Sequence, residues 1–472
     1  MKQDIKILAK LLGEVLYLLS FFHIVPSIVG LISLAMFQDI REMSYITMFA
    51  SISLILMLLG RFLKRIDANL DKLKIKPYLI AGAVGLAWLI VPFLGGIIYY
   101  YTGLSPVDSM FESMSAWTTT GFTAYNNVTD LSYSVKFWRS FEQWIGGLGI
   151  IVFLVFMISK NSLVYDMVRI EGREDFIEPT AKHTLIKMMK LYVSLTFIGA
   201  ALLSFAGMDI FTASNISMTA LATGGMTPFT QFSPTAIQQA IIILLMLAGA
   251  LNFAFHAMVF EGRIKKAFKR YEPLKWFIAL ISISGIIGIV NGINPLSSFF
   301  HSVSAITCSG FGYDDLAKKP EAYIFSLIAL MTIGGGIGST AGGIKIDRFI
   351  ILVKGIKLRL RKILHPRDMS IVERYMNSII DEKILAMVGV FFFSYISVLF
   401  ISSILLTFHT KDFVKSMFEV ASAMGNVGLE LNIVPSLPTA YKILLIIDMW
   451  LGRLEIFAAS ALILSLYKII RD

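Results

Sequence analysis

The sequence predicts an all-α integral membrane protein with ten transmembrane helices: two N-terminal helices, then four repeats of span, pore loop and span around a central pore. Composition is the first observation behind this prediction, because 56% of the residues are hydrophobic, only 16% are charged and the mean hydropathy is +0.74. Such a chain is too apolar for a protein with a water-facing surface. The second observation is an eleven-residue pattern that occurs four times, each time between two long apolar runs.

The pattern is first seen as FESMSAWTTTG, which begins at Phe111. It returns as NISMTALATGG from Asn215, FHSVSAITCSG from Phe300 and FEVASAMGNVG from Phe418. Every copy has Ser or Thr in fifth place, Ala in sixth and Gly in last: Ser115, Ala116 and Gly121; Thr219, Ala220 and Gly225; Ser304, Ala305 and Gly310; Ser422, Ala423 and Gly428. One such segment would be an ordinary helix end. Four copies indicate a repeated structural unit.

The apolar runs, in chain order, cover about residues 11–36, 43–62, 77–101, 138–159, 184–207, 236–260, 274–293, 321–343, 384–408 and 439–467. Each is near or above the roughly 20 residues that a helix needs to cross about 30 Å of hydrocarbon. The patterned segments are only about 10 to 14 residues long, so as helices they would reach about halfway across and must be re-entrant or lie at the surface. We therefore expect two N-terminal helices in 1–70 and four repeats in 77–160, 181–262, 272–350 and 380–472.

The distribution of basic residues predicts the orientation. Most of the 42 lysines and arginines fall in the N-terminus, in the C-terminal tail and in the segments 60–76, 160–190, 261–275 and 345–383. The positive-inside rule places these segments in the cytoplasm. We therefore expect a multi-pass protein of the cell membrane with both termini inside and the four patterned segments open to the outside. Topology also explains the net charge of +10 without nucleic acid as a partner.

Three further features limit the function. No cleavable signal peptide is evident, because the first apolar run, after Lys10, is longer than the usual hydrophobic region and lacks a small-residue cleavage site. The single cysteine, Cys308, excludes an intrachain disulfide and a cysteine-based metal cluster. The six histidines show no ligand spacing, so we interpret them as structural or surface residues.

Acidic residues flank the patterned segments: Asp108, Glu112, Asp209, Asp314, Asp315, Asp412, Glu419 and Glu430. Together they would form an acidic mouth that concentrates cations. The alternative is that they are solvated loop charges.

Four glycine loops within a membrane indicate a cation pore. Irregular backbone at membrane depth is tolerated only where protein or water satisfies its polar groups, and four equivalent loops can do so by turning their carbonyls toward a shared axis, where they replace the hydration shell of an ion. A final glycine has no Cβ and takes positive φ, so the backbone approaches the axis closely. The negative C-terminal ends of the short helices would face the same centre. No ring of carboxylates lies within the loops, which favours a monovalent over a divalent cation.

The candidate filter residues are the last three of each pattern: Thr119, Thr120 and Gly121; Thr223, Gly224 and Gly225; Cys308, Ser309 and Gly310; Asn426, Val427 and Gly428.

From about residue 77 to the end, the chain resembles the Trk/Ktr/HKT potassium transporter superfamily, and its two extra N-terminal spans are like those of the Trk-type membrane subunit. The resemblance is carried by FESMSAWTTTGF, QWIGGLGIIVF, the TGG loop, IGGGIGSTAGGIK, GNVG and LGRLEIF. It implies potassium uptake by a non-enzyme, with K⁺ as the transported ion, no organic cofactor, membrane lipid around it, and a homodimer bound to a TrkA-like cytoplasmic ring of nucleotide-binding subunits. The second loop lacks the aromatic residue that follows the glycine in the first and third.

A glycine-rich segment, GGGIGSTAGG from Gly334 to Gly343, interrupts the eighth apolar run. Its GIGSTA stretch is no dinucleotide site, because neither a preceding strand nor a βαβ unit is present, and nothing pairs Ser339 with His256 as in a serine protease. A kinked helix packed through glycines remains possible, whereas the resemblance implies an unwound gating loop beneath the filter. The candidate gating residues are Gly334, Gly335, Gly336, Gly338, Ser339, Thr340, Gly342, Gly343, Lys345 and Arg453.

Arg453 lies well inside the last span, where a charge is costly unless it faces a partner or a wet cavity. Neither Asp448 nor Glu455 is at i+3 or i+4 spacing, so we expect its partner on another segment. The resemblance places this arginine along the ion path, where a fixed positive charge would slow cations.

Three other functions remain to be weighed. An alternating-access carrier should show inverted repeats and a midplane site, whereas these repeats place their loops on one side. An intramembrane enzyme lacks a convincing catalytic constellation. A sodium-permeable or cation-coupled member of the same family is the remaining alternative.

Overall fold

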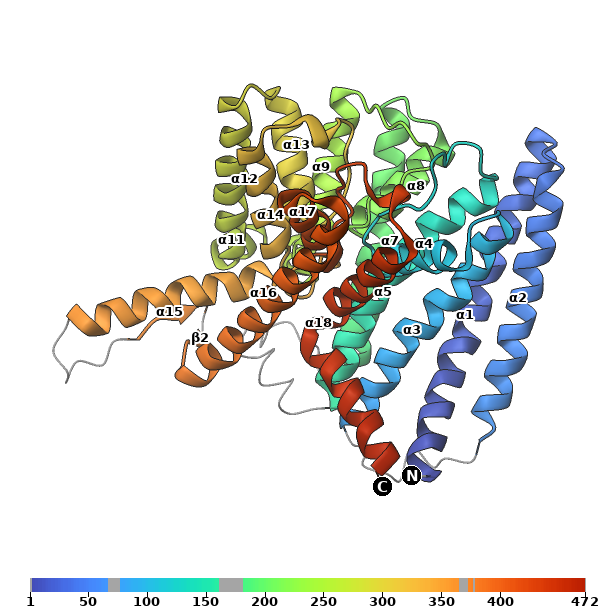
Figure 1. Cartoon of the computed structure of the whole chain (residues 1–472), viewed down its shortest axis with the longest axis horizontal. Helices are drawn as coiled ribbons and strands as arrows, with labels where there is room; N and C mark the ends of the chain where they lie inside the picture. The colour runs from blue at the N-terminus through green and yellow to red at the C-terminus, as the bar shows by residue number, and fades with distance from the viewer. Residues whose placement is uncertain (1, 67–76, 161–180, 365–371, 377, 472) are drawn as a thin grey trace.

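The computed structural model describes residues 2–66, 77–160, 181–364, 372–376 and 378–471. Within these ranges the chain is almost entirely helical, and a helix occupies each predicted apolar run (Figure 1). The fold class is therefore confirmed. Parts of the basic segments 60–76, 160–190 and 345–383, and the ends of the first and last predicted units at residues 1, 67–70 and 472, lie outside the described residues.

The helices follow the predicted order. Helices α1 (Lys2–Phe37) and α2 (Arg41–Lys64) pack against each other at one edge of the molecule (Figure 1). The rest are α3 (Pro77–Tyr101), α4 (Pro106–Trp117), α5 (Tyr133–Lys160), α7 (Ala181–Phe205), α8 (Ile210–Leu221), α9 (Ala236–Ala250), α10 (Phe253–Phe260), α11 (Ile264–Arg270), α12 (Pro273–Val290), α13 (Pro295–Ile306), α14 (Glu321–Ile333), α15 (Ile346–Leu364), α16 (Glu382–Thr410), α17 (Phe413–Met424) and α18 (Thr439–Arg471). The other described elements are the 3₁₀ turns η2 (Leu316–Lys318) and η3 (Val434–Ser436) and the antiparallel pair of β1 (Arg374–Tyr375) with β2 (Ser378–Ile379). The repeat boundaries remain a prediction.

The four patterned segments form the short helices α4, α8, α13 and α17, each 12 residues long. A helix of this length spans about 18 Å, too little to cross a membrane. Each begins at an N-cap side chain that accepts a backbone N–H: Ser105, Asp209, Asn294 and Asp412. All four lie in the half of the molecule away from both chain termini (Figure 1).

Three of the predicted spans are broken, and in α18 the break is a kink at Glu455, where φ is +59°. Helix α14 ends at Ile333 because Gly334 takes φ +73°, and α15 then projects sideways from the bundle (Figure 1). The run 236–260, which we expected as one span, bends by 109° between α9 and α10. Asn252 stands at this bend and accepts the N–H of Ala254 as the N-cap of α10. A uniformly apolar run gives no sign of such a break.

Among the described residues, five helices are long and apolar enough to cross a membrane, or six if the bent pair α9–α10 counts as one span. Helix α14, with 13 residues, and the part Gly85–Tyr101 of α3 are apolar but shorter than a span.

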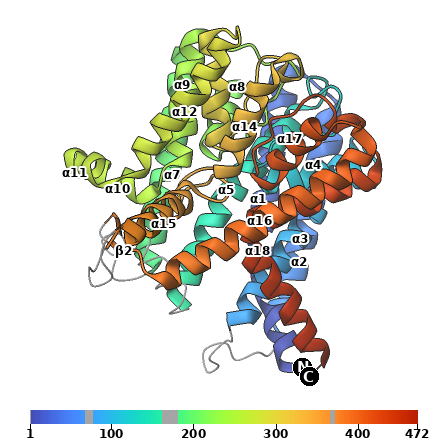
Figure 2. The same ribbon diagram turned by 60° about the vertical axis from the view of Figure 1, so that its left-hand side comes forward.

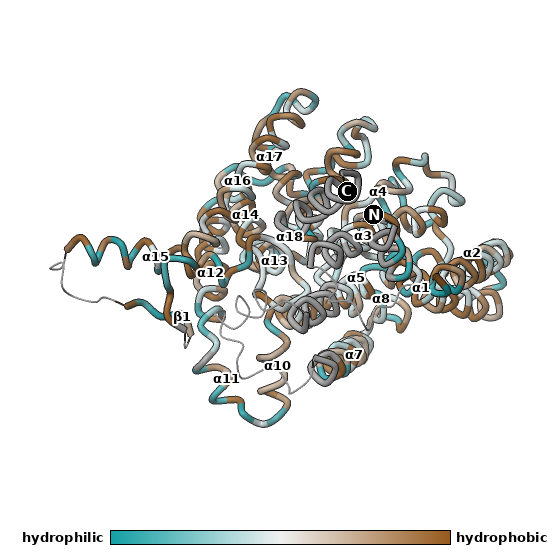
Figure 3. Tube along the Cα trace, turned by 90° about the horizontal axis from the view of Figure 1, so that it is seen from below, coloured by the Kyte–Doolittle hydropathy of each residue, from teal (hydrophilic) through white to brown (hydrophobic). Residues whose placement is uncertain are grey.

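The outer faces of the bundle are apolar. Phe62, Phe197 and Phe393 are 69%, 73% and 74% exposed, and apolar residues run along α2 and α16 in the view from below (Figure 3). Helix α16 lies beside α17 and α18 (Figure 2). Exposure of so many large apolar side chains is unfavourable in water but suits a lipid environment.

Candidate functional site

Each short helix is followed by a loop with the same backbone conformation. We name these glycine loop 1 (residues 118–122), loop 2 (222–226), loop 3 (307–311) and loop 4 (425–429). In every loop the second residue and the glycine at the fourth place have positive φ: Thr119 and Gly121 at 56° and 98°, Thr223 and Gly225 at 54° and 73°, Cys308 and Gly310 at 54° and 69°, Asn426 and Gly428 at 50° and 94°. Left-handed backbone costs about 1–2 kcal/mol for a residue with a side chain. Its recurrence at four equivalent positions shows that one geometry is imposed on all four loops.

The shared fifth and sixth places of the sequence pattern hold this geometry. The carbonyl oxygen of the fifth residue accepts the N–H of the third loop residue, as in Thr120 N to Ser115 O at 2.8 Å. The carbonyl of the sixth residue accepts the N–H of the second, as in Thr119 N to Ala116 O at 3.0 Å. The same two bonds occur in the other loops, to Thr219 and Ala220, to Ser304 and Ala305, and to Ser422 and Ala423.

The four loops close into a ring. A Cβ on Gly121 would lie 2.1 Å from the Gly224 carbonyl oxygen in loop 2, well inside van der Waals contact. The same relation links loop 2 to loop 3, loop 3 to loop 4 and loop 4 back to loop 1. A Cβ on Gly225 would lie 2.2 Å from Ser309 O, one on Gly310 2.0 Å from Val427 O, and one on Gly428 2.0 Å from Thr120 O. Only glycine fits at these four places, because the backbone of the neighbouring loop occupies the space of a side chain. All twelve predicted filter residues therefore lie in this ring.

The ring lies where the four short helices end. A helix C-terminus carries partial negative charge, and the loop carbonyls add further dipoles of the same sign. Carbonyl oxygens that replace the hydration shell of an ion favour a desolvated cation. A side-chain bridge also closes the ring between loops 4 and 1, since Asn426 Nδ2 donates to Thr120 Oγ1 at 3.2 Å and to Met449 O at 2.9 Å.

A buried ion pair supports loops 1 and 2 from behind, and the sequence analysis did not identify it. Arg139 Nε donates to Glu112 Oε1 at 2.7 Å, and both side chains are almost fully buried. Glu112 also accepts the N–H of Ala124, and Arg139 donates to the Thr227 carbonyl oxygen at 3.0 Å. The two residues are 27 positions apart in the sequence, so no local spacing could reveal their pairing.

Most of the acidic residues expected at the mouth have structural partners. Asp209 and Asp412 are N-caps, and Asp108, Asp314 and Asp315 form ion pairs with Lys442, Lys319 and Lys318. Glu419 accepts the N–H of Leu431 at 2.7 Å, and Glu112 pairs with Arg139. These carboxylates therefore cap short helices or pair with nearby side chains and backbone groups.

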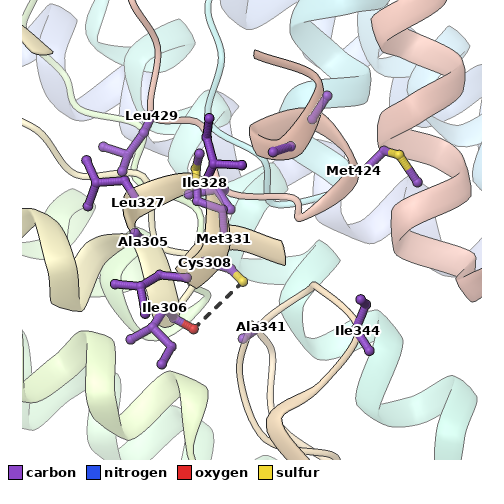
Figure 4. Packing of buried hydrophobic residues seen from close by; sticks show 14 of the residues in the cluster. Ala305, Ile306, Cys308, Leu327, Ile328, Met331, Ala341, Ile344, Met424 and Leu429 are labelled. Atoms are coloured by element: carbon purple, nitrogen blue, oxygen red, sulfur yellow. Dashed lines mark hydrogen bonds between the residues drawn. The ribbon is translucent and has the colours of Figure 1, made fainter. Parts of the chain in front are cut away.

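The glycine-rich segment forms a loop between α14 and α15, residues 334–345, which we name the α14–α15 loop. Its two ends are held together, since Ile344 N donates to Thr332 O at 3.0 Å and Lys345 N to Ile333 O at 2.9 Å. At Gly342, a Cβ would lie 2.1 Å from the Gly425 carbonyl oxygen. Figure 4 shows Cys308 of glycine loop 3 directed toward Ala341 of this loop. The segment therefore lies directly against the end of the ring at which the short helices terminate.

Thr340 attaches the tip of the α14–α15 loop to the second repeat. Its hydroxyl group lies 3.0 Å from both Leu221 O and Gly249 O, and 3.2 Å from Thr223 Oγ1 in glycine loop 2. Lys345 donates to the carbonyl of Ala341 within the loop. The predicted gating residues 334–345 thus form one packed body, which is unwound as expected and is not a continuous kinked helix.

Arg453 has its partners on other segments, as predicted. Its guanidinium donates to Thr340 O at 2.9 Å and to Gly146 O at 2.7 Å. The side chain is buried, and the described ion pairs include none to Arg453. Arg453 therefore joins α18 to the tip of the α14–α15 loop and to α5 while keeping a positive charge beneath the ring.

The protease interpretation fails on geometry. Ser339 donates to Gly336 O, and His256 contacts the carbonyl of Ala248. No hydrogen bond joins the two among the described contacts. Within the described ranges, no group of three or more His, Cys, Asp or Glu residues could hold a metal ion.

The TrkH family model, described as a cation transport protein, matches residues 97–282 and 273–466. An uncharacterized cation transporter of Methanocaldococcus jannaschii is 33% identical over 99% of this chain and 97% of its own length. The Trk system potassium uptake protein TrkH of Escherichia coli K12 is 29% identical over 80% of this chain and 83% of its own. The crystal structure of the potassium transporter TrkH from Vibrio parahaemolyticus matches with a TM-score of 0.84 and 24% identity, over 97% of this chain and 98% of that one, which supports the fold.

Proposed function

Because the chain belongs to the TrkH family of cation transport proteins, we propose that it takes up K⁺ across the cell membrane through the ring of glycine loops. The observation that carries this proposal is the closed ring, in which each of four loops meets the next at a glycine. Relatives named potassium uptake proteins support K⁺ as the ion.

The ring supplies the selectivity. A cation that enters it exchanges water for carbonyl oxygens of residues 119–121, 223–225, 308–310 and 426–428. Four glycines without side chains keep the loops close enough to act on one ion. A side chain at Gly121 would widen or distort the ring. Because loop 1 has glycine at this place, we favour K⁺ over the alternative of a sodium-permeable transporter.

The α14–α15 loop supplies the gate. It lies against the inner end of the ring through Gly342 and is held by Thr340 and Arg453. In this position it obstructs the ion path, and the positive charge of Arg453 adds an electrostatic barrier to cations. Movement of the loop, rather than of the ring, would then open the path.

Orientation and partners are part of the same proposal. We place both termini in the cytoplasm and the short helices toward the outside, which follows the distribution of basic residues. The protein would work as a homodimer with a cytoplasmic TrkA-like ring of nucleotide-binding subunits, surrounded by membrane lipid and without an organic cofactor. Co-purification of a ring-forming protein from the native host tests this part; a strictly monomeric protein that binds none would contradict it.

Reversal potentials of the purified protein in liposomes test the function. We expect a clear preference for K⁺ and Rb⁺ over Na⁺ when the gradients are exchanged. A preference for Na⁺ would favour the sodium-permeable alternative. Flux that follows an imposed proton or sodium gradient, with no response to membrane potential alone, would favour a cation-coupled carrier.

A further inference from the structure

Three spans carry equivalent glycines behind the glycine loops. Gly146 of α5, Gly249 of α9 and Gly452 of α18 each pack under the end of the short helix in their own repeat, where a Cβ would lie 2.1 to 2.4 Å from the carbonyl oxygen of Trp117, Leu221 or Met424. These three glycines therefore mark equivalent positions, from which the sequences of the spans can be aligned. Three positions earlier stand Gln143, Met246 and Met449, all buried. In the third repeat Met331 stands three positions before Gly334, whose Cβ would instead meet the Gly342 carbonyl oxygen. The first repeat alone has a polar residue there.

Gln143 holds glycine loop 2 through both ends of its amide. Nε2 donates to Gly224 O at 2.7 Å, and Oε1 accepts the N–H of Met226 at 3.1 Å. These two backbone groups belong to the peptides on either side of Gly225, the glycine of loop 2 with positive φ. A single side chain therefore holds the orientation of the peptide before Gly225 and of the peptide after it.

Loop 2 lacks the support that loops 1 and 4 have. In loop 1 the Ser115 hydroxyl accepts the N–H of Gly121 at 3.1 Å, and in loop 4 the Ser422 hydroxyl accepts the N–H of Gly428 at 2.9 Å. The equivalent Thr219 hydroxyl instead donates to the carbonyls of Asn215 and Ile216 in its own helix. Gln143 instead holds loop 2 from the neighbouring repeat, through the two peptide groups that flank Gly225.

Gln143 and Gly224 are also complementary in size, because the large side chain of one fills the space left by the missing side chain of the other. Loops 1, 3 and 4 have Thr120, Ser309 and Val427 where loop 2 has Gly224. A Cβ at Gly224 would lie 2.4 Å from the Gln143 side-chain carbon Cδ. The glutamine thus occupies the space that a side chain takes in the other loops, which explains the second glycine of the TGG sequence.

We propose that Gln143 is a positioning residue for ion selection, which clamps the Gly224 carbonyl of glycine loop 2 in the geometry that K⁺ requires. The proposal rests on the potassium function of the ring. The Gly224 carbonyl oxygen contacts loop 1 at Gly121, so its displacement changes two of the four loops together. Selection between K⁺ and Na⁺ by carbonyls depends on their number and placement. Among the described contacts, the hydrogen bonds of Gln143 go to loop 2 and none goes to the α14–α15 loop.

Gln143→Met tests the proposal, because methionine is the residue of similar length at the equivalent positions and makes neither hydrogen bond. In liposomes under opposed K⁺ and Na⁺ gradients, the ratio of K⁺ to Na⁺ permeability should fall about fivefold or more, the factor that corresponds to one net hydrogen bond. Met246→Leu is the matched control and should keep the wild-type ratio. A wild-type ratio in conducting Gln143→Met protein overturns the inference but leaves the proposed function standing. Wild-type protein without K⁺ preference overturns both.

A second pair of variants tests the proposal independently if Gln143→Met folds poorly. Gly224→Ala alone should lower both the yield of folded protein and the permeability ratio, since its Cβ meets Gln143. Gly224→Ala combined with Gln143→Ala removes the clash but not the need for the clamp. We expect it to restore the yield while the ratio stays low. Full recovery of the ratio in the double variant, or a wild-type ratio in Gly224→Ala, would overturn the inference.

Discussion

Substitution of Gly121 by serine tests the ring most directly. Gly121 has φ +98°, and its missing Cβ would meet the Gly224 carbonyl oxygen at 2.1 Å. The positive φ alone costs a residue with a side chain about 1–2 kcal/mol. An ordinary contact is longer by more than 1 Å, so either loop 1 or loop 2 must move by about that much, in a site whose carbonyls must jointly replace the water of an ion.

We therefore expect Gly121→Ser to weaken discrimination between K⁺ and Na⁺ by about 1.4 kcal/mol or more, which is about tenfold in the permeability ratio. Tenfold corresponds to a shift of about 59 mV in the reversal potential of a monovalent ion. The assay is the reversal potential of purified protein in planar bilayers or liposomes with K⁺ on one side and Na⁺ on the other.

Gly103→Ser is the matched control. Gly103 has nearly the same backbone angle, φ +101°, but a Cβ there would meet nothing within 4 Å. This variant should be destabilised by backbone strain and yet keep the wild-type reversal potential. If conducting Gly121→Ser protein keeps the wild-type selectivity, glycine loop 1 is no part of the filter and the reasoning from the ring fails.

Three other changes give separate tests. Thr340→Val removes a hydroxyl group that lies within hydrogen-bond distance of Leu221 O and Gly249 O. Its loss should destabilise the closed position of the α14–α15 loop by about 1–3 kcal/mol and so raise basal rubidium uptake. Unchanged uptake would mean that the loop does not gate. Arg453→Ala should also raise basal uptake, about tenfold for a barrier lowered by about 1.4 kcal/mol, and lower uptake in well-folded protein would contradict the barrier. Burial, with a smaller contribution from the Glu112 carboxylate, raises the pKa of Glu430 to about 7, so this carboxyl group is neutral below that pH and charged above it. Uptake should therefore increase as the external pH rises through about 7, and Glu430→Gln should remove that dependence; an unchanged pH profile in the variant would exclude Glu430.

The spans and the four loops could be predicted from the sequence because both depend on local patterns. Hydropathy sets the length of a crossing helix, and the repeated Ser or Thr, Ala and Gly reflect identical hydrogen bonds in each loop, as in Ser115 and Ala116. The glycine with positive φ was predictable for the same reason. The left-handed residue two places earlier, such as Thr119, was not, because its side chain gives no sign of that conformation.

Supporting residues were harder to predict because their partners lie far along the chain. Arg139 was visible as a charge near a span, but its pairing with Glu112 requires the fold. Gln143 left a signal that could have been used, since a glutamine in an apolar run must find hydrogen-bond partners. Its partners, Gly224 and Met226, belong to another repeat.

The bend between α9 and α10 depends on the α14–α15 loop, which explains why hydropathy alone missed it. Backbone groups freed by the break are paired by that loop: Gly336 N donates to Ala250 O at 2.9 Å, Thr340 N to Gly249 O at 3.1 Å, and Phe253 N to Gly338 O at 3.2 Å. A buried group left without a partner costs about 1–3 kcal/mol. Withdrawal of the loop therefore requires either that the helix break refold or that water reach these groups. Water that fills the path would satisfy them and hydrate the arriving ion together, so under the proposed gating the opening of the loop and the wetting of the path would be one step.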